Sequence, residues 1–256
     1  MAAPTFRQRL YDGEVTVGTF QVIDSPVVSE VVGLSGMDFT IIDQEHGPLT
    51  AESSLAMCAA AERGGAAPIV RVRENTEGEI QRALDVGAAG VEIPQIETRE
   101  DAEAAVEHAR FTPLGSRGLS PYTRAARYDG GPDYTDRQNE EVTVIVHIEG
   151  ERGVENLDEI MAVEGIDVLF LGPYDMSQSI GIPGQVRDER VEALMDEVCE
   201  RAGEAGKIVG TFADDPEMAR RWIDVGAQYI AVLEDAPILK RAFSDTREAI
   251  LSDDGE

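Results

Sequence analysis

The stretch VTVIVHIE, at residues 142–149, decides the fold because its two faces differ in character. Positions 142, 144, 146 and 148 are apolar, and His147 and Glu149 lie on the opposite face, because successive side chains of a strand point to opposite sides. In a closed barrel, the face that carries the imidazole and the carboxylate should be the lumen. The stretch therefore predicts a barrel strand with ionisable side chains near its carboxyl end.

Short apolar runs alternate with amphipathic windows along almost the whole chain. We expect strands at 17–22, 39–43, 68–72, 90–94, 142–149, 167–172, 207–212 and 229–233. We expect helices between them, for example at 50–63, 76–86, 99–109, 152–162, 188–205, 215–224 and 236–250, with Thr50, Thr98 and Asp214 as N-caps. Eight strand–helix units predict an α/β fold, a (β/α)8 TIM barrel, as a single domain over residues 1–256.

Two segments depart from this alternation. Residues 111–141 are rich in Gly, Pro, Arg and Tyr and are expected to form a long loop, and SDDGE at 252–256 is expected to be an acidic tail. A doubly wound open sheet is the alternative fold. It is disfavoured because no G-x-G-x-x-G follows the first strand.

The charge of the chain excludes some partners. Fifty acidic and 22 basic residues give a net charge of −28, so phosphate backbones would be repelled and nucleic acid is not an expected partner. No apolar run approaches the roughly 20 residues of a membrane span. The N-terminus has no apolar signal region, which predicts a cytoplasmic location. Dispersed acidic residues suggest a halophilic protein; stability that is indifferent to salt would contradict this hypothesis.

The expected strand ends gather polar chemistry, which in a barrel indicates the functional face. Asp43 ends the second strand, Arg71 lies in the third between two valines, Glu149 ends the fifth, and Asp175 follows the sixth. Carboxylates at the ends of adjacent strands, completed by water and substrate, suit Mg²⁺ or Mn²⁺. The same carboxylates could instead form a structural network or cap a helix. His147 could add a third ligand or simply fill the lumen.

His46 follows a strand directly and has acidic neighbours. An imidazole next to a carboxylate suits a general base, because the carboxylate orients the ring and raises its basicity. The alternative is a loop histidine that is hydrogen-bonded to the backbone. The residue pattern alone leaves both interpretations open.

Four stretches at these strand ends carry a family resemblance: IIDQEHGPLT (41–50), PIVRV (68–72), VHIE (146–149) and LFLGPYDMSQSIG (169–181). Together they resemble the HpcH/HpaI aldolases, the class II pyruvate-dependent aldolases, over roughly residues 16–235. The resemblance implies a (β/α)8 barrel of the phosphoenolpyruvate/pyruvate type, assembled as a homo-trimer or homo-hexamer with helix exchange. It also implies reversible cleavage of a 4-hydroxy-2-oxo acid, such as a 2-keto-3-deoxy sugar acid, into pyruvate and an aldehyde.

The resemblance also implies roles for individual residues. Glu149 and Asp175 would hold Mg²⁺, Mn²⁺ or Co²⁺; His46 would be the base, supported by Asp43 and made more basic by Asp85; Arg71 would stabilise the enolate; and His147, Gly172, Pro173, Tyr174 and Asp175 would contact substrate. Two positions depart from the commonest pattern. His147 stands where the family usually has Gln, and Tyr174 where it usually has a small residue.

The two lysines limit the possible mechanisms. Lys207 begins the expected seventh strand and Lys240 lies in the last helix, so neither suits a Schiff-base aldolase, which needs a lysine in the lumen near a strand end. Two other functions are kept as alternatives. One is an acyl-CoA lyase of the citrate lyase β type, with Arg117, Arg124 and Arg127 as a basic patch. The other is a non-catalytic barrel that binds a metal and an oxo acid.

Overall fold

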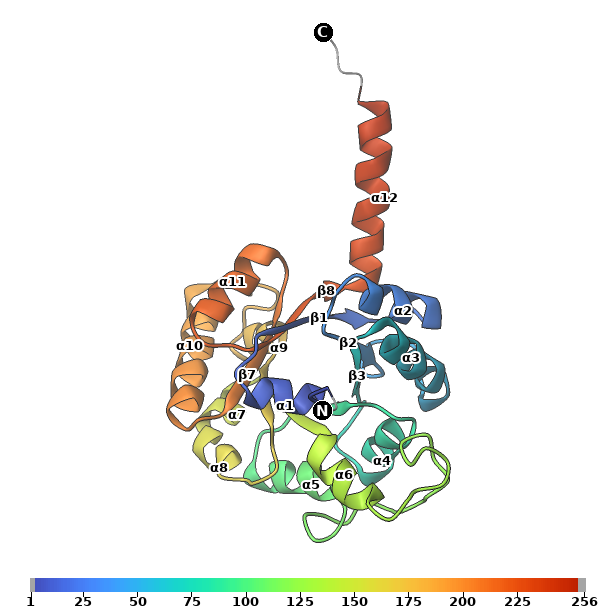
Figure 1. The fold of residues 1–256 in the computed structure, drawn as a ribbon. Helices are drawn as coiled ribbons and strands as arrows, with labels where there is room; N and C mark the ends of the chain where they lie inside the picture. The colour runs from blue at the N-terminus through green and yellow to red at the C-terminus, as the bar shows by residue number, and fades with distance from the viewer. Residues whose placement is uncertain (1–2, 253–256) are drawn as a thin grey trace.

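Eight parallel strands form a closed barrel in a computed structural model that describes residues 3–252. Each strand pairs with its neighbours in chain order and the last pairs with the first (Figure 1). The strands are β1 Thr16–Gln21, β2 Phe39–Asp43, β3 Ala67–Arg71, β4 Gly90–Ile93, β5 Thr143–Ile148, β6 Val168–Leu171, β7 Ile208–Ala213 and β8 Tyr229–Glu234. The predicted (β/α)8 fold is confirmed.

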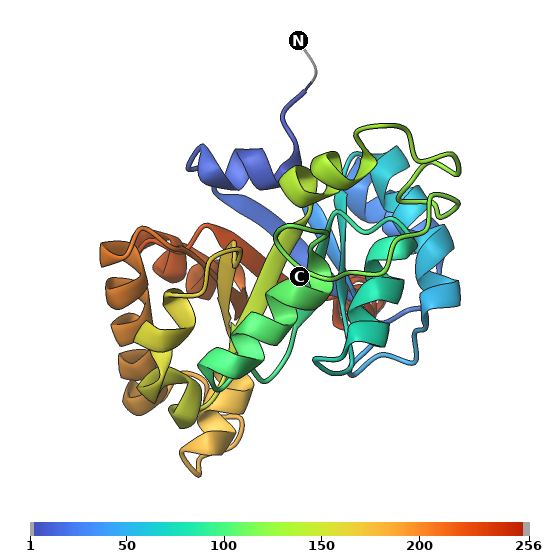
Figure 2. The ribbon, with the colours of Figure 1, turned by 90° about the horizontal axis from the view of Figure 1, so that it is seen from below.

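Most of the helices surround this barrel (Figure 2). The helices are α1 Phe6–Tyr11, α2 Pro26–Leu34, α3 Ala51–Gly64, α4 Glu77–Asp85, α5 Arg99–Ala109, α6 Tyr134–Glu141, α7 Glu151–Glu155, α8 Leu157–Met161, α9 Pro173–Ser179, α10 Glu189–Glu204, α11 Pro216–Asp224 and α12 Asp235–Leu251. The window expected at 152–162 is two short helices, and the loop expected at 111–141 ends in α6. The assignment of a single domain stays a prediction. The expected acidic tail, apart from Ser252, lies outside the described residues.

The alternation read from residues 142–149 describes β5 correctly. Val144, Val146 and Ile148 pack into the large cluster between strands and helices, whereas Ile145 belongs to the cluster inside the barrel. His147 lies one pleat further along the inner face and is fully buried. The inner face thus changes from apolar to ionisable toward the carboxyl end of the strand, which is the end where chemistry is expected.

Bulky side chains fill the barrel at the end where the strands begin, and small residues make room for them. Phe6 of α1 packs on Phe39 and Tyr229, the first residues of β2 and β8, so α1 closes the end where the strands begin. A side chain at Gly18 would come within 2.5 Å of the Phe39 ring. Because aromatic rings fill the barrel at this end, we expect an accessible cavity at the opposite end.

Two of the three expected N-caps are confirmed and one is wrong. Thr50 and Thr98 accept hydrogen bonds from the first turns of α3 and α5. The cap of α11 is Asp215, which accepts from the backbone of Glu217 and Met218, and not Asp214. The side chain of Asp214 is therefore available for another contact.

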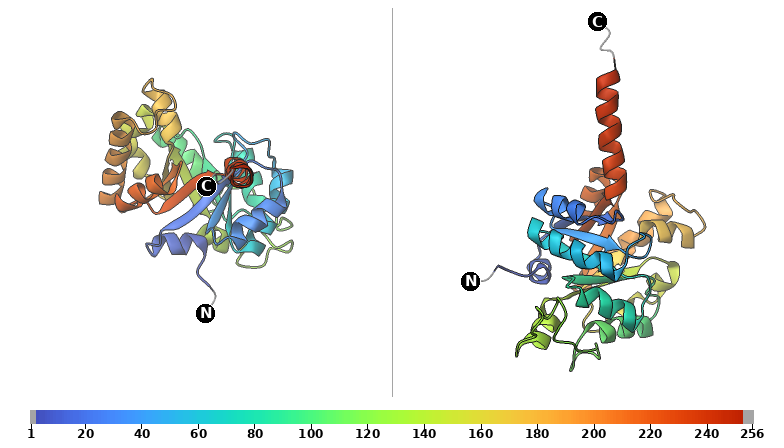
Figure 3. Two further views of the ribbon diagram at one scale, coloured as in Figure 1. Left: turned by 90° about the horizontal axis from the view of Figure 1, so that it is seen from above. Right: turned by 90° about the vertical axis from the view of Figure 1, so that its right-hand side faces the viewer.

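The last helix does not cover the barrel. After Asp235, α12 extends away from the body of the molecule, as the right-hand view of Figure 3 shows, and every residue from 239 to 251 is exposed. Leu239, Phe243, Ile250 and Leu251 are among its exposed apolar side chains. Within the described part of the chain, no helix has the length and apolar character needed to cross a membrane.

Candidate active site

A cavity of about 270 Å³ lies at the carboxyl ends of the strands. It is lined by Phe20, His46, Arg71, His147, Glu149, Phe170, Gly172, Pro173, Tyr174, Asp175, Phe212 and Glu234. Most of the residues singled out in the sequence are therefore in one place. Asp43 lies behind this lining, bonded to Arg71, and Asp85 lies elsewhere.

Arg71 and Asp43 end neighbouring strands in register and form a two-bonded ion pair. Arg71 Nε and Nη2 donate to the two Asp43 oxygens at 2.8 and 2.7 Å, and Nη1 lies 3.3 Å from Glu45 Oε2. Burial raises the pKa of Asp43, but the hydrogen bonds and charge of Arg71 outweigh it and lower that pKa below its ordinary value. The guanidinium is thus fixed, with one edge on Asp43 and the cavity beside it.

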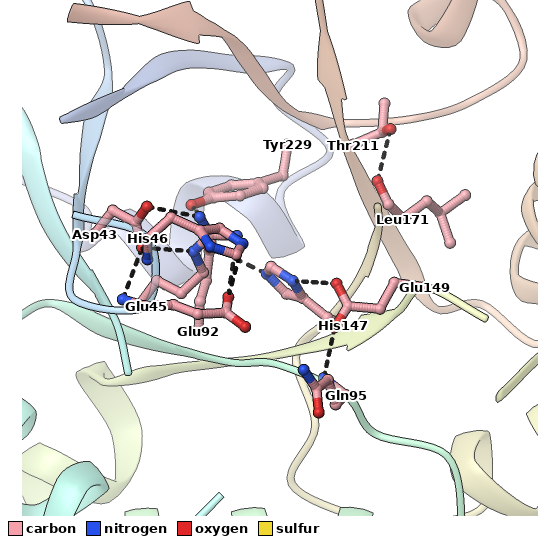
Figure 4. A network of polar contacts seen from close by, with 11 residues as sticks. Asp43, Glu45, His46, Glu92, Gln95, His147, Glu149, Leu171, Thr211 and Tyr229 are labelled. Carbon is pink, nitrogen blue, oxygen red and sulfur yellow. Dashed lines mark hydrogen bonds and ion pairs between the residues drawn. The ribbon is translucent and has the colours of Figure 1, made fainter. Parts of the chain in front are cut away.

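His46 is held by its backbone, and its ring is free to reach substrate. Its N–H donates to Asp43 Oδ1 at 3.3 Å, and its imidazole Nε2 lies 3.9 Å from Glu45 Oε2 (Figure 4). The side chain is 65% exposed. Asp43 therefore supports the loop of His46 rather than its ring, which differs from the orientation that the sequence suggested.

Glu149 and Asp175 converge on Gly172. A methyl group on Gly172 would lie 3.0 Å from Glu149 Oε2 and 3.9 Å from Asp175 Oδ2, so both carboxylates face the same small space. Glu149 is further fixed by the backbone N–H of Gln95, which donates to its Oε1 at 2.7 Å. Burial and the nearby charge of Glu149 raise the pKa of Asp175, as expected for two carboxylates that share one space.

A buried chain of polar groups inside the barrel supports Glu149. His147 Nδ1 lies 3.1 Å from Glu149 Oε2, and its Nε2 lies 3.2 Å from Glu92 Oε2. The Tyr229 hydroxyl donates to Glu92 Oε1 at 2.6 Å. Burial lowers the pKa of His147, but hydrogen bonds to the two carboxylates outweigh it and raise that pKa to about 9. Because both ring nitrogens are engaged, His147 orients Glu149 and does not reach substrate without losing a partner.

Tyr174 lies at the rim of the cavity. It follows Pro173, the first residue of α9, and its hydroxyl donates to Asp214 Oδ1 at 2.9 Å. Burial and this hydrogen bond raise the pKa of Tyr174 to about 12, so the hydroxyl stays protonated at neutral pH. Gly172 and Pro173 also line the cavity.

The structure does not bring Asp85 to this cavity. It ends α4, just before β4 begins, and therefore lies toward the opposite end of the barrel from the carboxyl ends of the strands. Its carboxylate accepts from Arg117 Nη2 at 2.7 Å. Within one chain, Asp85 therefore supports the loop at 111–133 and not the His46 ring.

Several cavity and support residues were missed in the sequence. Glu92 carried a usable signal, because it is a lone acid inside the apolar run GVEIP at 90–94. Tyr229 begins β8, where the sequence alone shows no sign of a partner on a distant strand. Phe20 and Phe212 read as ordinary strand residues, although their rings line the cavity.

Comparison with known proteins agrees with the barrel fold. The chain matches the family model described as HpcH/HpaI aldolase/citrate lyase over residues 16–240. A 5-keto-4-deoxy-D-glucarate aldolase of Shigella boydii is 35% identical over 237 residues, which are 93% of this chain and 92% of that protein. Both chains are thus matched over nearly their whole length.

Solved structures share this fold over nearly their whole length. An HpcH/HpaI aldolase/citrate lyase family protein from Burkholderia cenocepacia superposes with a TM-score of 0.92 at 35% identity, over 96% of this chain and 98% of that one. The structure of citrate synthase SbnG superposes with a TM-score of 0.89 at 32% identity, over 98% and 99% of the two chains.

The barrel, its strand-end site and these matches define a carbon–carbon lyase of the aldolase type. More particularly, the chain belongs to the HpcH/HpaI aldolase/citrate lyase family. The family and the class of enzyme predicted from the sequence are confirmed, whereas the roles of individual residues remain proposals.

Proposed function

We propose that the protein is a metal-dependent aldolase that reversibly cleaves a keto-deoxy sugar acid, a 4-hydroxy-2-oxo acid, into pyruvate and an aldehyde. The observation that carries this proposal is the convergence of Glu149 and Asp175 on Gly172, in the same cavity as His46 and Arg71. The name of the Shigella boydii relative supports the substrate class.

The donor set at Gly172 fits a divalent cation such as Mg²⁺, Mn²⁺ or Co²⁺. Two carboxylate oxygens face one space, and hard oxygen donors suit these ions. Among residues 3–252, no group of three or more His, Cys, Asp and Glu side chains could hold a metal ion. Glu149 and Asp175 would therefore hold the ion together with water and the oxo acid. When bound, such an ion lowers the energy of negative charge that develops on the substrate oxygens.

The side chains around this space can perform the cleavage. His46 takes the proton of the substrate C4 hydroxyl while the C3–C4 bond breaks, the electron pair of that bond passes to C3, and C4 leaves as an aldehyde. Arg71 donates to the 2-oxo oxygen, where negative charge accumulates. The proton held by His46 then passes to C3 and completes pyruvate. The backbone N–H groups in the first turn of α9 have no acceptor within the helix, so they can bind the carboxylate group of the oxo acid.

The positions of the lysines support a mechanism without a Schiff base. Lys207 lies immediately before β7, at the end of the barrel opposite the cavity, and Lys240 lies in the projecting α12. The chain contains no other lysine. Charge on the substrate must therefore be stabilised by other groups, which agrees with a bound cation and Arg71.

Exchange of the pyruvate methyl protons in D2O, followed by NMR, tests the proposal. The wild-type protein with Mn²⁺ should exchange these protons and condense pyruvate with a short aldehyde, whereas chelator should stop both reactions. His46→Ala should still bind pyruvate but lose exchange. Exchange that continues after exhaustive EDTA treatment would refute metal dependence.

The acyl-CoA lyase remains the competing function, and the arginine positions disfavour it. Arg124 and Arg127 line a separate hollow beside α6 and Phe6, near the end of the barrel that α1 closes, and Arg117 is paired with Asp85. A CoA phosphate would find none of them at the mouth of the cavity. Cleavage of a CoA ester, measured beside free 2-oxo acids, separates the two functions, and activity on neither supports the non-catalytic barrel.

We also infer that the working form is a homo-trimer or homo-hexamer. Supporting features are the exposed apolar side chains of α12 and an apolar row on α2, where Val27, Val31 and Leu34 are 68%, 57% and 70% exposed. A helix that leaves its own barrel with Phe243 at 73% exposure is stabilised when it packs on a second copy. Light scattering in high salt checks this, and Phe243→Glu should shift the mass toward one chain. A cytoplasmic location stays a prediction.

A further inference from the structure

Tyr174 and Asp214 join two neighbouring loops across the rim of the cavity. Tyr174 lies at the start of α9, directly after β6, and Asp214 follows the last residue of β7. Their hydrogen bond of 2.9 Å connects the ends of strands that are paired in the barrel. The bond can form because Asp215, rather than Asp214, caps α11.

The Tyr174 ring is held from a second side. It meets Phe212 edge to face with ring centroids 5.9 Å apart, and Phe212 lies 5.9 Å from Phe20. The three rings form an aromatic wall along the cavity, and the guanidinium of Arg71 stacks 4.6 Å from the centroid of Phe20. A ring fixed by one hydrogen bond and one aromatic contact occupies a defined volume rather than swinging with the solvent.

The position of this rim matters for the second substrate. The Tyr174 ring contacts Asp214 and Phe212 on the β7 side of the cavity, whereas Asp175 faces Glu149 at Gly172. If pyruvate binds beside the two carboxylates, the ring borders the space that is left for the aldehyde. The cavity of about 270 Å³ is small for a ligand pocket, for which about 300–1,000 Å³ is usual. A fixed aromatic ring at its rim therefore limits the room available to a long aldehyde.

We propose that the Tyr174–Asp214 bridge determines which aldehydes the enzyme accepts, by limiting their chain length. This inference rests on the proposed aldolase function. It makes Tyr174 a specificity-determining residue and Asp214 a positioning residue that acts through Tyr174.

Aldol addition of pyruvate to a series of straight-chain aldehydes, from glycolaldehyde and propanal to hexanal, tests the inference. The measured quantity is the ratio of kcat/KM for hexanal to kcat/KM for propanal. Tyr174→Ala should raise this ratio by about tenfold or more, because each methylene that a pocket accepts or rejects is worth about 10-fold or more. Tyr174→Phe and Asp214→Ala keep the ring but release it, and should raise the ratio by a smaller factor.

A second tyrosine–aspartate bond provides a matched control. The Tyr11 hydroxyl donates to Asp167 at 2.8 Å at the α1 end of the barrel, far from the rim. Tyr11→Phe should leave the ratio unchanged, and KM for pyruvate should stay within about twofold in the Tyr174 and Asp214 variants.

Two results would overturn the inference. One is a hexanal-to-propanal ratio that is the same in Tyr174→Ala and Asp214→Ala as in the wild type. The other is a rise in the pyruvate KM as large as the change for the aldehydes, which would place Tyr174 at the pyruvate end. Failure of the wild-type enzyme to exchange the pyruvate methyl protons is a different outcome, since it would reject the proposed function and the inference with it.

Discussion

Arg71 and Asp43 form a buried, two-bonded ion pair at the point where β2 and β3 end side by side. The pair fixes the plane of the guanidinium while one side of it lines the cavity. Asp43 also accepts the backbone N–H groups of Glu45 and His46. One carboxylate therefore positions both the proposed base and the proposed charge-stabilising group.

Arg71→Lys should lower kcat by about 10²- to 10³-fold, because an ammonium group cannot keep both bonds to Asp43 and also donate to substrate. Steady-state kinetics with pyruvate and a short aldehyde measures this. Arg73→Lys is the matched control, since Arg73 makes the same two-bonded contact with Glu79 on the surface. Comparable losses in both variants would contradict the role given to Arg71.

The low pKa of Asp43 predicts a pH dependence of folding. A carboxyl group whose pKa is depressed in the folded protein stabilises it above the ordinary pKa of about 4, and that contribution is lost as pH falls through the depressed value. Asp43→Asn removes the carboxylate that makes two bonds to the buried Arg71 and leaves only Glu45 as a charged partner, so it should cost about 3 kcal/mol at neutral pH. The cost should shrink as the pH is lowered, because the wild type then loses the same pair.

Urea unfolding between about pH 3 and 7 measures this difference. Asp188→Asn is the control: hydrogen bonds from Arg190 lower the pKa of Asp188 to about 2, but this pair lies at the surface, with the Arg190 side chain 60% exposed, so salt should screen its effect. A difference between wild type and Asp43→Asn that stays constant with pH would contradict the prediction.

His147 should matter for metal affinity as well as for stability. His147→Leu removes the partner of both Glu92 and Glu149 in a buried site, so we expect lower resistance to urea and roughly 10- to 100-fold weaker Mn²⁺ binding. His147→Gln keeps one hydrogen-bond donor, so its Mn²⁺ affinity and its resistance to urea should lie between those of the wild type and His147→Leu. Calorimetry reports the affinity, and His108→Leu in α5 controls for the loss of an imidazole outside the cavity. Wild-type Mn²⁺ affinity in His147→Leu would refute the supporting role.

Gly172→Ala tests the shared space of the two carboxylates. The φ angle of Gly172 is −92°, so the backbone accepts Ala, but the new methyl group would lie 2.9 Å from Glu149 Cβ and must displace that side chain. Activity and Mn²⁺ affinity should fall while the fold survives. Gly203→Ala in α10 meets nothing within 4 Å and should be neutral or stabilising. Full activity in Gly172→Ala would show that the carboxylates do not depend on this space.

The barrel was predictable because its signal is local. In β5, a period of two over a few residues separates the face toward the helices from the face toward the lumen, and the same alternation places Arg71 inside between two outward valines. The carboxyl ends of the strands then gather at one end by topology alone. The cavity residues Glu149, Asp175 and His46 could therefore be named before any contact was known.

The missed features depend on contacts between distant parts of the chain. Glu92 and His147 are 55 positions apart, and their bond depends on the stagger between β4 and β5, which no residue pattern encodes. The helix α2 lacks a polar face, since Val27, Val31 and Leu34 are exposed, so amphipathic periodicity could not reveal it. The pattern of α12 shows which residues are apolar, but not whether its partner is this chain or another.

The central claim is that Glu149 and Asp175 hold one divalent ion, and titration of chelator-treated protein with Mn²⁺ in a calorimeter tests it most directly. The wild type should bind one ion per chain, and Glu149→Gln and Asp175→Asn should each bind it roughly 100-fold more weakly or not at all. Glu234→Gln, a carboxylate of the same cavity outside the proposed pair, should bind like the wild type. Unchanged Mn²⁺ affinity in both Glu149→Gln and Asp175→Asn would contradict the account.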